Sequence, residues 1–178
     1  MTLSIISPFP CLPMSVIDQH SLEVISRSSE QTRRVGMRLG ALLLPGDVIG
    51  MQGDLGAGKT TFVQGVASGW GSLDQVSSPT FVLVNVYRRL DGGKLYHLDA
   101  YRLSGSAEAI DLDIDAMLSQ SPLLIEWADR IKEALPENHL WIKMRWIDEE
   151  QRDFIFTAQG EHYQTILNNF KKDVYGVT

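Results

Sequence analysis

The nine residues GDLGAGKTT, Gly53 to Thr61, decide what kind of fold this chain forms. They match the spacing Gly-x-x-x-x-Gly-Lys-Thr, which is typical of a loop that binds the phosphates of a nucleotide. In such a loop, glycines let the backbone curl so that successive N–H groups point inward, and the helix that follows adds partial positive charge at its start. The stretch therefore predicts a nucleotide site between a strand and a helix.

The residues on both sides of this loop have the pattern that the prediction requires. The stretch DVIGMQ, 47–52, is short, mostly apolar and followed by glycine, as a buried parallel strand should be. The apolar residues of FVQGVASGW, 62–70, are spaced as in a helix that packs on a sheet. A glycine-rich turn that matched the motif by accident would lack both neighbours.

Strands and helices are predicted along the rest of the chain as well. A helix begins at the capping box of Ser28 and Gln31 and stops at Pro45. An Asp-Gly-Gly turn joins two strand-like stretches, 81–90 and 94–103, into a hairpin. Further expected elements are one or two short helices over 104–120, strands over 123–125, 139–146 and 152–158, and a helix over 163–170. This order predicts an α/β, P-loop NTPase-like three-layer sandwich whose sheet is mostly parallel, with an antiparallel hairpin.

Length and composition favour a soluble protein with one core. Of 178 residues, 44% are hydrophobic and 21% charged, which is typical of globular domains. We expect a loosely ordered N-terminal extension over 1–20, where prolines interrupt any signal-like run, and a single P-loop ATPase domain over 21–178. Cys11 is the only cysteine, so no internal disulfide can form and a cytoplasmic location is favoured. No stretch approaches the ~18 apolar residues of a membrane span.

The charge of the chain argues against direct binding of nucleic acid. The formal net charge is -6, which repels a phosphate backbone, and no basic stripe is present. Any RNA would have to be reached through a partner protein.

The predicted nucleotide-binding residues come from the loop and from one later position. Lys59 would reach the β- and γ-phosphates, and the hydroxyl of Thr60 would help to hold Mg²⁺. Trp127, beside Glu126, fits a packing role as well as contact with the nucleotide. The full binding set is Asp54, Leu55, Gly56, Ala57, Gly58, Lys59, Thr60, Thr61 and Trp127, with ATP and Mg²⁺ as cofactors.

Two acidic residues at the ends of apolar stretches are candidates for metal binding and hydrolysis. Asp99 follows LYHL and Glu126 follows LLI. Strand ends border the ligand crevice in open α/β sheets, while Mg²⁺ requires carboxylate support and a hydrolytic water must be oriented. The predicted metal ligands are therefore Thr60, Asp99 and Glu126. Either carboxylate alone also fits a plain surface charge, and the sequence leaves open which one holds the metal and which orients water.

The segment SSPTF, 77–81, and His97 each admit two interpretations. Proline restricts its predecessor and fixes its own φ, so Thr80 would be held in a defined orientation where it could sense a γ-phosphate. The segment also fits a simple turn before a strand. His97 would share a strand face with Asp99, but no third metal ligand is evident, which favours a hydrogen-bonded structural histidine. The predicted catalytic set is Lys59, Thr80, Asp99 and Glu126.

The class of nucleotide protein follows from motifs that the chain lacks. GTP switches read guanine with Asn-Lys-x-Asp, and the sequence contains no Asn-Lys pair. A small-molecule kinase would need a segment to clamp a second phosphate-bearing substrate, and no arginine-rich lid is evident. A compact ATPase is the interpretation that remains.

Four motifs in one order, GDLGAGKTT, SSPTF, YHLDAYRL and IEWAD, resemble the TsaE (YjeE) family of ATPases in tRNA threonylcarbamoyladenosine synthesis. The likeness runs from about residue 21 to about residue 158 and weakens beyond. It implies a mostly parallel sheet with ATP and Mg²⁺ at the loop, and a switch-like segment that contains Thr80. It also implies that Asp99 and Glu126 serve metal binding or hydrolysis, and that Trp127 lies near the site.

The same resemblance implies a partner-dependent activity. The family's members are weak ATPases that act with TsaD and TsaB, which transfer the threonylcarbamoyl group to adenosine 37 of tRNAs reading ANN codons. On this interpretation tRNA is contacted only indirectly, and no membrane is involved. The alternatives are a small-molecule kinase and an ATP-dependent adaptor that does not hydrolyse the nucleotide.

Overall fold

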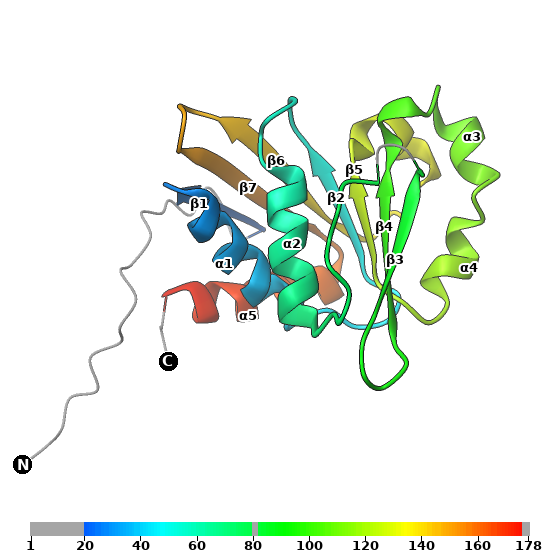
Figure 1. Ribbon diagram of the computed structural model, residues 1–178, viewed down its shortest axis with the longest axis horizontal. Coiled ribbons are helices and arrows are strands. Elements are labelled where there is room, and N and C mark those ends of the chain that lie inside the picture. The colour runs from blue at the N-terminus through cyan, green and yellow to red at the C-terminus, as the bar shows by residue number, and fades with distance from the viewer. Residues whose placement is uncertain (1–19, 80–81, 176–178) are drawn as a thin grey trace, which may run out of the picture.

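The computed structural model describes residues 20–79 and 82–175, whose strands form one seven-stranded sheet in the order β1-β7-β6-β2-β5-β4-β3 (Figure 1). The strands are β1 (Ser21–Ser26), β2 (Val48–Gln52), β3 (Val84–Arg88), β4 (Lys94–Asp99), β5 (Leu123–Glu126), β6 (His139–Trp146) and β7 (Arg152–Gln159). The helices are α1 (Ser29–Gly40), α2 (Lys59–Trp70), α3 (Ser106–Ile110), α4 (Ile114–Leu118) and α5 (Glu161–Tyr175), with 3₁₀ helices η1 (Ala100–Arg102) and η2 (Ala128–Ala134).

The centre of the sheet is parallel and its edges are antiparallel. Strand β2 pairs in parallel with both β5 and β6, and β4 pairs in parallel with β5. Strand β7 runs opposite to its neighbours β6 and β1, and β3 runs opposite to β4. Only β3 and β7 therefore oppose the common direction, which confirms the predicted mostly parallel sheet with an antiparallel hairpin.

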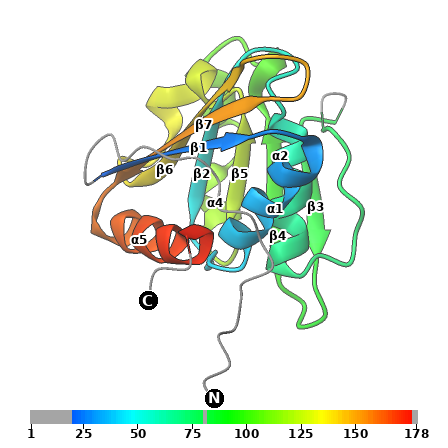
Figure 2. The same cartoon turned by 90° about the vertical axis from the view of Figure 1, so that its left-hand side faces the viewer.

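Helices cover both faces of the sheet, as predicted, and each face has its own core. Helices α1, α2 and α5 contribute to the larger apolar cluster, which includes Ile49 and Met51 of β2. The short helices α3, α4 and η2 cover the other face over β2, β5 and β4, where Val48 and Leu123 are buried. Figure 2 shows the sheet between α1 and α2 on one side and the short helices on the other.

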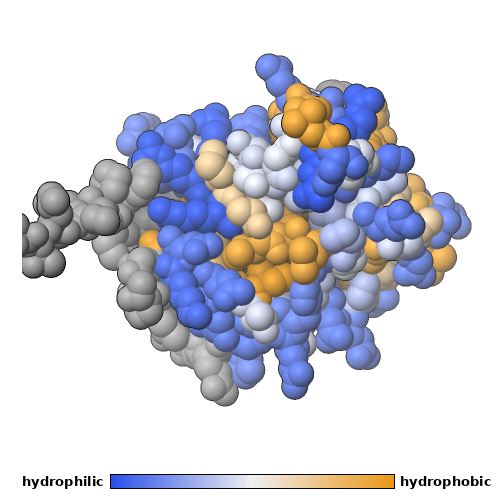
Figure 3. Space-filling model, turned by 90° about the horizontal axis from the view of Figure 1, so that it is seen from below, coloured by the Kyte–Doolittle hydropathy of each residue, from blue (hydrophilic) through white to orange (hydrophobic). Residues whose placement is uncertain are grey.

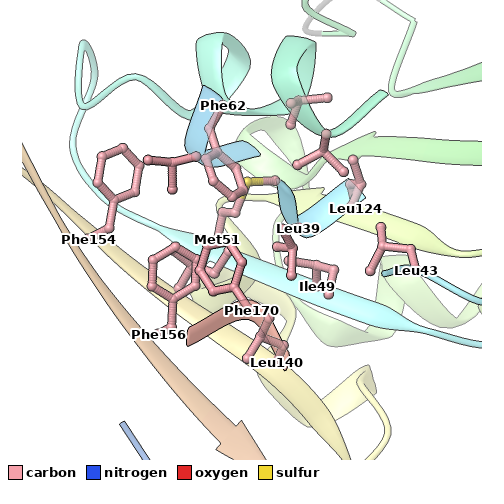
Figure 4. Packing of buried hydrophobic residues seen from close by; sticks show 14 of the residues in the cluster. Leu39, Leu43, Ile49, Met51, Phe62, Leu124, Leu140, Phe154, Phe156 and Phe170 are labelled. Atoms are coloured by element: carbon pink, nitrogen blue, oxygen red, sulfur yellow. The ribbon is translucent and has the colours of Figure 1, made fainter. Parts of the chain in front are cut away.

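Aromatic side chains fill the larger core where β7 meets α2 and α5 (Figure 4). The ring of Phe62 lies 5.6 Å from that of Phe154 and 6.1 Å from that of Phe156. Phe156 in turn contacts Phe170 of α5, with 5.0 Å between ring centres. These contacts fasten α5 to the sheet and to the helix that follows the phosphate-binding loop.

Helices α1 and α2 lie side by side with their backbones in contact (Figure 1). The contact is formed by four glycines, two from each helix: Gly36, Gly40, Gly65 and Gly69. A Cβ atom on Gly69 would lie 1.8 Å from the carbonyl oxygen of Met37, and one on Gly40 would lie 2.0 Å from that of Val66. Any side chain at these positions would therefore push the helices apart.

The capping box predicted for α1 is present. The backbone N–H of Gln31 donates to Ser28 Oγ at 3.1 Å, and the side chain of Gln31 accepts from the N–H of Arg27 at 2.8 Å. The helix ends at Gly40, earlier than the predicted stop at Pro45. The chain then turns at once, which carries Leu43 into the core.

Other element boundaries differ from the predictions. Strand β1 was not predicted, because SLEVIS is short and only its alternate residues are buried against the core. The 3₁₀ helix η2 was not predicted either, since only three of its seven residues are apolar and the segment is short. Strand β3 begins at Val84, later than expected, and α5 is longer than 163–170. The predicted extension lies outside the described residues except for His20.

The end of the molecule away from the phosphate-binding loop carries an apolar area within a mostly hydrophilic surface (Figure 3). Leu44, which is 57% exposed, lies in the turn before β2 at this end. Over residues 20–79 and 82–175, no helix has the length and apolar character needed to cross a bilayer.

Candidate nucleotide-binding site

The predicted phosphate-binding loop connects the end of β2 to the start of α2, as the motif requires. Gly56 and Gly58 have φ values of 81° and 96°, a left-handed conformation that glycine adopts without strain. Gly58 caps α2 without a side-chain hydrogen bond from the described residues, so the first turn directs backbone N–H groups outward. This arrangement suits an anion at the start of the helix.

A cavity of about 540 Å³ lies over this loop and collects most of the predicted residues. Among the residues predicted to bind or act, those lining it are Leu55, Gly56, Gly58, Lys59, Thr60, Thr61, Asp99, Glu126 and Trp127. The walls come from six separate parts of the chain: the loop with the start of α2, the start of α1, Ser78 before β3, the end of β4, the end of β5, and the turn between β6 and β7. The starts of both α1 and α2 thus meet at one cavity.

Two of the predicted residues that the structure describes, Asp54 and Ala57, are not part of this lining. The side chain of Ala57 is buried in the larger core, and its N–H donates to the carbonyl of Asp54 at 3.1 Å. Asp54 contributes that carbonyl, which also accepts from Lys59. Thr80 falls outside the described residues, so its predicted role stays a prediction.

Lys59 is held against the loop although it carries a charge. It is only 5% exposed, and its Nζ donates to the carbonyls of Gly53 at 2.6 Å and Asp54 at 2.9 Å. The Nζ also lies 3.7 Å from the ring centre of Trp127. Burial lowers the pKa of Lys59, and nearby carboxylates, Glu126 above all, oppose that shift. An anionic phosphate would supply the negative charge that this partly desolvated ammonium lacks.

Thr60, Glu126 and Asp99 form a compact group of oxygen atoms beside the lysine. The Thr60 hydroxyl donates to Glu126 Oε1 at 2.8 Å. Asp99 and Glu126 are partners in register on the parallel strands β4 and β5, and each is 3% exposed. Asp99 also accepts from the N–H of Tyr101 at 2.9 Å, which fixes its orientation.

These oxygen atoms fit Mg²⁺ better than they fit a metal held by protein alone. Hydroxyl and carboxylate oxygens are the donors that Mg²⁺ prefers. In the part of the chain that the structure describes, no group of three or more His, Cys, Asp or Glu is arranged to hold a metal. A Mg²⁺ ion usually takes one or two carboxylates and completes its shell with water and phosphate oxygens, which agrees with this arrangement.

Trp127 is packed against its neighbours and also lines the cavity. Its φ of 59° is left-handed, which costs a non-glycine residue about 1 to 2 kcal/mol. Its ring lies 5.0 Å from that of Tyr101 and faces the Lys59 ammonium. The tryptophan is therefore packed and at the same time lines the cavity.

Several residues that line the cavity were not found from the sequence: Ser28, Ser29, Thr32, Ser78, Glu149, Glu150 and Arg152. Arg152 Nε donates to the carbonyl of Gly56 at 3.2 Å, and its Nη1 donates to the carbonyl of Asp148 at 2.8 Å. The arginine thus joins the turn between β6 and β7 to the loop. No local motif marks a contact between residues so far apart in the chain. The capping pattern at Ser28 gave a helix start but not its position at the cavity.

Comparisons with known proteins agree with the fold and with this site. The family model described as "Threonylcarbamoyl adenosine biosynthesis protein TsaE" matches residues 26–154. The tRNA threonylcarbamoyladenosine biosynthesis protein TsaE of Bacillus subtilis is 38% identical over 144 residues, which cover 80% of this chain and 89% of the relative. The protein of that name from Streptomyces coelicolor is 42% identical over 139 residues, covering 75% and 94%.

A solved structure gives the same result. The crystal structure of Bacillus subtilis YdiB superposes with a TM-score of 0.72 at 33% sequence identity, and the match covers 86% of this chain and 95% of that one. YdiB and this chain therefore share the P-loop NTPase-like fold. From its matched residues, its relatives and its sheet with a glycine-rich loop after β2, the chain belongs to the TsaE family.

Proposed function

We propose that this protein binds ATP with Mg²⁺ and hydrolyses it in the biosynthesis of threonylcarbamoyladenosine at position 37 of tRNAs that read ANN codons. The observation that carries the proposal is the single cavity in which Lys59 and Thr60 of the loop meet Glu126 and Asp99. The pathway is supported by relatives that carry its name at 38% and 42% identity.

In the proposed mechanism, the start of α2 and Lys59 bind the phosphates. The Lys59 ammonium leaves its two carbonyl partners for phosphate oxygens, a stronger, charge-assisted interaction. Mg²⁺, when bound, offsets the negative charge of the β- and γ-phosphates. Glu126 fixes the Thr60 hydroxyl and with it forms the metal-binding pair, while the adjacent Asp99 orients the attacking water and accepts its proton.

The chain acts, in this proposal, together with TsaB and TsaD in the cytoplasm. Its net charge of -6 disfavours direct contact with tRNA, so the RNA would be bound by those partners. ATP hydrolysis would govern association with the partner enzyme and its resetting, and ATP would not donate a group to the tRNA.

The test is phosphate release from MgATP by the purified protein, alone and with TsaB and TsaD. We expect slow release alone and faster release with both partners. Glu126→Gln and Asp99→Asn should each lower the stimulated rate by roughly 100-fold or more, the range of a lost catalytic acid–base group. Asp115→Asn, on α4 outside the lining of the cavity, is the matched control and should leave the rate unchanged.

Three other outcomes would contradict this proposal. Near-normal stimulated rates in both carboxylate variants would remove Asp99 and Glu126 from catalysis. Tight nucleotide binding without phosphate release, even with both partners, would indicate an adaptor. Phosphate found on a metabolite would indicate a small-molecule kinase.

A further inference from the structure

A buried chain of hydrogen bonds connects the proposed metal-side carboxylate to the opposite wall of the cavity. Glu126 Oε1, which accepts from Thr60, also lies 2.9 Å from Nε2 of His97. The other ring nitrogen of His97, Nδ1, lies 3.0 Å from the Tyr87 hydroxyl. That hydroxyl is 3.1 Å from the backbone carbonyl of Ser77, to which it can donate.

The burial of this chain makes its hydrogen bonds costly to lose. His97 is 0% exposed, and Tyr87 and Glu126 are each 3% exposed. A buried carboxylate needs donors, and Glu126 Oε1 has two in Thr60 and His97. The contact between His97 and Glu126 is buried, so removing it leaves a buried polar group without its partner.

One neutral tautomer of the His97 ring can form hydrogen bonds with both of its neighbours, Glu126 and Tyr87. If Nε2 carries the hydrogen, it donates to Glu126, and Nδ1 then needs a donor, which the Tyr87 hydroxyl supplies. Burial raises the pKa of Tyr87, so its phenol keeps the hydrogen needed for this bond. The Ser77 carbonyl then still has a donor, because the Asn85 side-chain amide lies 3.0 Å from it.

The far end of the chain of hydrogen bonds lies next to the cavity wall. Ser77 precedes Ser78, which lines the cavity. Tyr87 and Asn85 lie on β3, whereas His97 lies on β4, next to the strand that ends in Glu126. The hydrogen bonds thus run across three strands, from the loop side of the cavity to the β3 side.

We infer that His97 and Tyr87 are positioning residues for the proposed hydrolysis. His97 holds the Glu126 carboxylate in the orientation in which it accepts from Thr60. Tyr87 holds the histidine ring, and the Asn85 amide, which donates to both the Tyr87 hydroxyl and the Ser77 carbonyl, ties it to the Ser77–Ser78 wall. This inference rests on the proposed function: it predicts an effect on turnover that exceeds any effect on nucleotide affinity.

The deciding variant is Tyr87→Phe, which removes one oxygen and leaves the packed ring. With TsaB and TsaD present, it should lower kcat for MgATP roughly fivefold or more, the factor that one lost hydrogen bond gives, while affinity for MgATP changes less than about twofold. Tyr96→Phe on β4 is the matched control, because Tyr96 packs in the smaller core on the other face. It should leave both quantities unchanged. Equal kcat for Tyr87→Phe and the wild type would overturn the inference.

A pair of histidine variants tests the same role without reference to Tyr87. In His97→Gln, the amide can still donate to Glu126, whereas in His97→Leu it cannot. The glutamine variant should retain several-fold more kcat than the leucine variant at equal nucleotide affinity. Equal loss in both, with unfolding midpoints in urea that match, would show that only packing matters and would contradict the inference.

A spectroscopic measurement separates failure of this inference from failure of the proposed function. In ¹⁵N NMR of the histidine side chains, Nε2 of His97 should carry a hydrogen, and the Nδ1 signal should shift in Tyr87→Phe. If this signature is present but the wild type never releases phosphate, the proposed function fails and the hydrogen-bonded chain stands. If the wild type hydrolyses ATP but the Nδ1 signal does not respond, the inference fails alone.

Discussion

On the face of the sheet that α1, α2 and α5 cover, the two halves of the sheet bury different kinds of side chain. In the half formed by β1, β7 and β6, the inner face is filled by aromatic and aliphatic residues such as Phe154 and Phe156. In the half formed by β2, β5 and β4, the equally buried His97, Asp99 and Glu126 stand among the apolar residues. The carboxyl ends of parallel strands meet at one edge, so their polar residues gather there, whereas neighbouring antiparallel strands end at opposite edges. One half thus serves mainly stability and the other the proposed chemistry.

The largest expected effect is on the stability of the antiparallel half. Phe156 is fully buried between Phe62, Phe154 and Phe170, so Phe156→Ala should lower the free energy of unfolding by about 3 to 5 kcal/mol. Urea unfolding measures the change, and Leu90→Ala, at a residue 90% exposed, is the control. The folded fraction should still bind MgATP normally. A decrease of less than about 1 kcal/mol in the free energy of unfolding would contradict the conclusion that this half of the sheet serves mainly stability.

The second largest expected effect is weaker binding of MgATP, without a loss of folding stability. Lys59→Ala should weaken MgATP binding by roughly 10- to 100-fold in calorimetry, because one charge-assisted contact is lost. Unfolding should not become easier, since burial already disfavours the charged ammonium and lowers the pKa of Lys59. Lys94→Ala, at the start of β4 far from the loop, serves as the control. Unchanged affinity in Lys59→Ala would refute the assignment of the loop.

The contact between α1 and α2 supports both halves and gives a third prediction. Gly69→Ala places a methyl group where the carbonyl of Met37 stands, so it should destabilise the fold by about 1 to 3 kcal/mol through overpacking. Ser68→Ala, one residue earlier and exposed, removes only a surface hydroxyl and should be neutral. Equal unfolding midpoints for the two variants would show that the helices can separate freely.

The smallest expected effect is on the pH dependence of stability, at the contact where α5 meets β2 between the two halves. The buried Tyr163 hydroxyl accepts from the N–H of Val48 at 2.7 Å, and burial raises the pKa of Tyr163 to about 12. In the unfolded chain this phenol ionises near pH 10, so between pH 10 and 12 the unfolded state binds fewer protons and stability falls as pH rises. From pH 10 to 11 the stability of the wild type relative to Tyr163→Phe should fall by about 1 kcal/mol. A constant difference would contradict the assignment.

Much of the parallel half could be predicted from the sequence because its signals are local. The loop, the strand before it and the helix after it have fixed spacing and clear periodicity. The capping box at Ser28 and the apolar run before Glu126 are read in the same way. That Asp99 and Glu126 both border the cavity followed from a general rule about strand ends, without knowledge of the strand order.

The features of the fold and of the site that could not be predicted depend on contacts between distant parts of the chain. Arg152 reaches Gly56 only because β7 returns beside β6, which in turn pairs with β2. The sequence indicated a hydrogen-bonded role for His97 but could not supply its partner, since Glu126 lies on another strand. Strand β1 was missed because a short alternating stretch has no turn signal that sets it apart.

The glycine contact between α1 and α2 also constrains how the cavity can change shape. Both helices start at the cavity. Carbonyl oxygens of each helix lie against the glycine Cα atoms of the other, so neither helix can slide or tilt without a steric clash. The part of the cavity wall formed by the starts of α1 and α2, which includes Ser29 and Thr61, is consequently rigid. Any change in the shape of the cavity would therefore have to come from its other walls, such as the turn between β6 and β7.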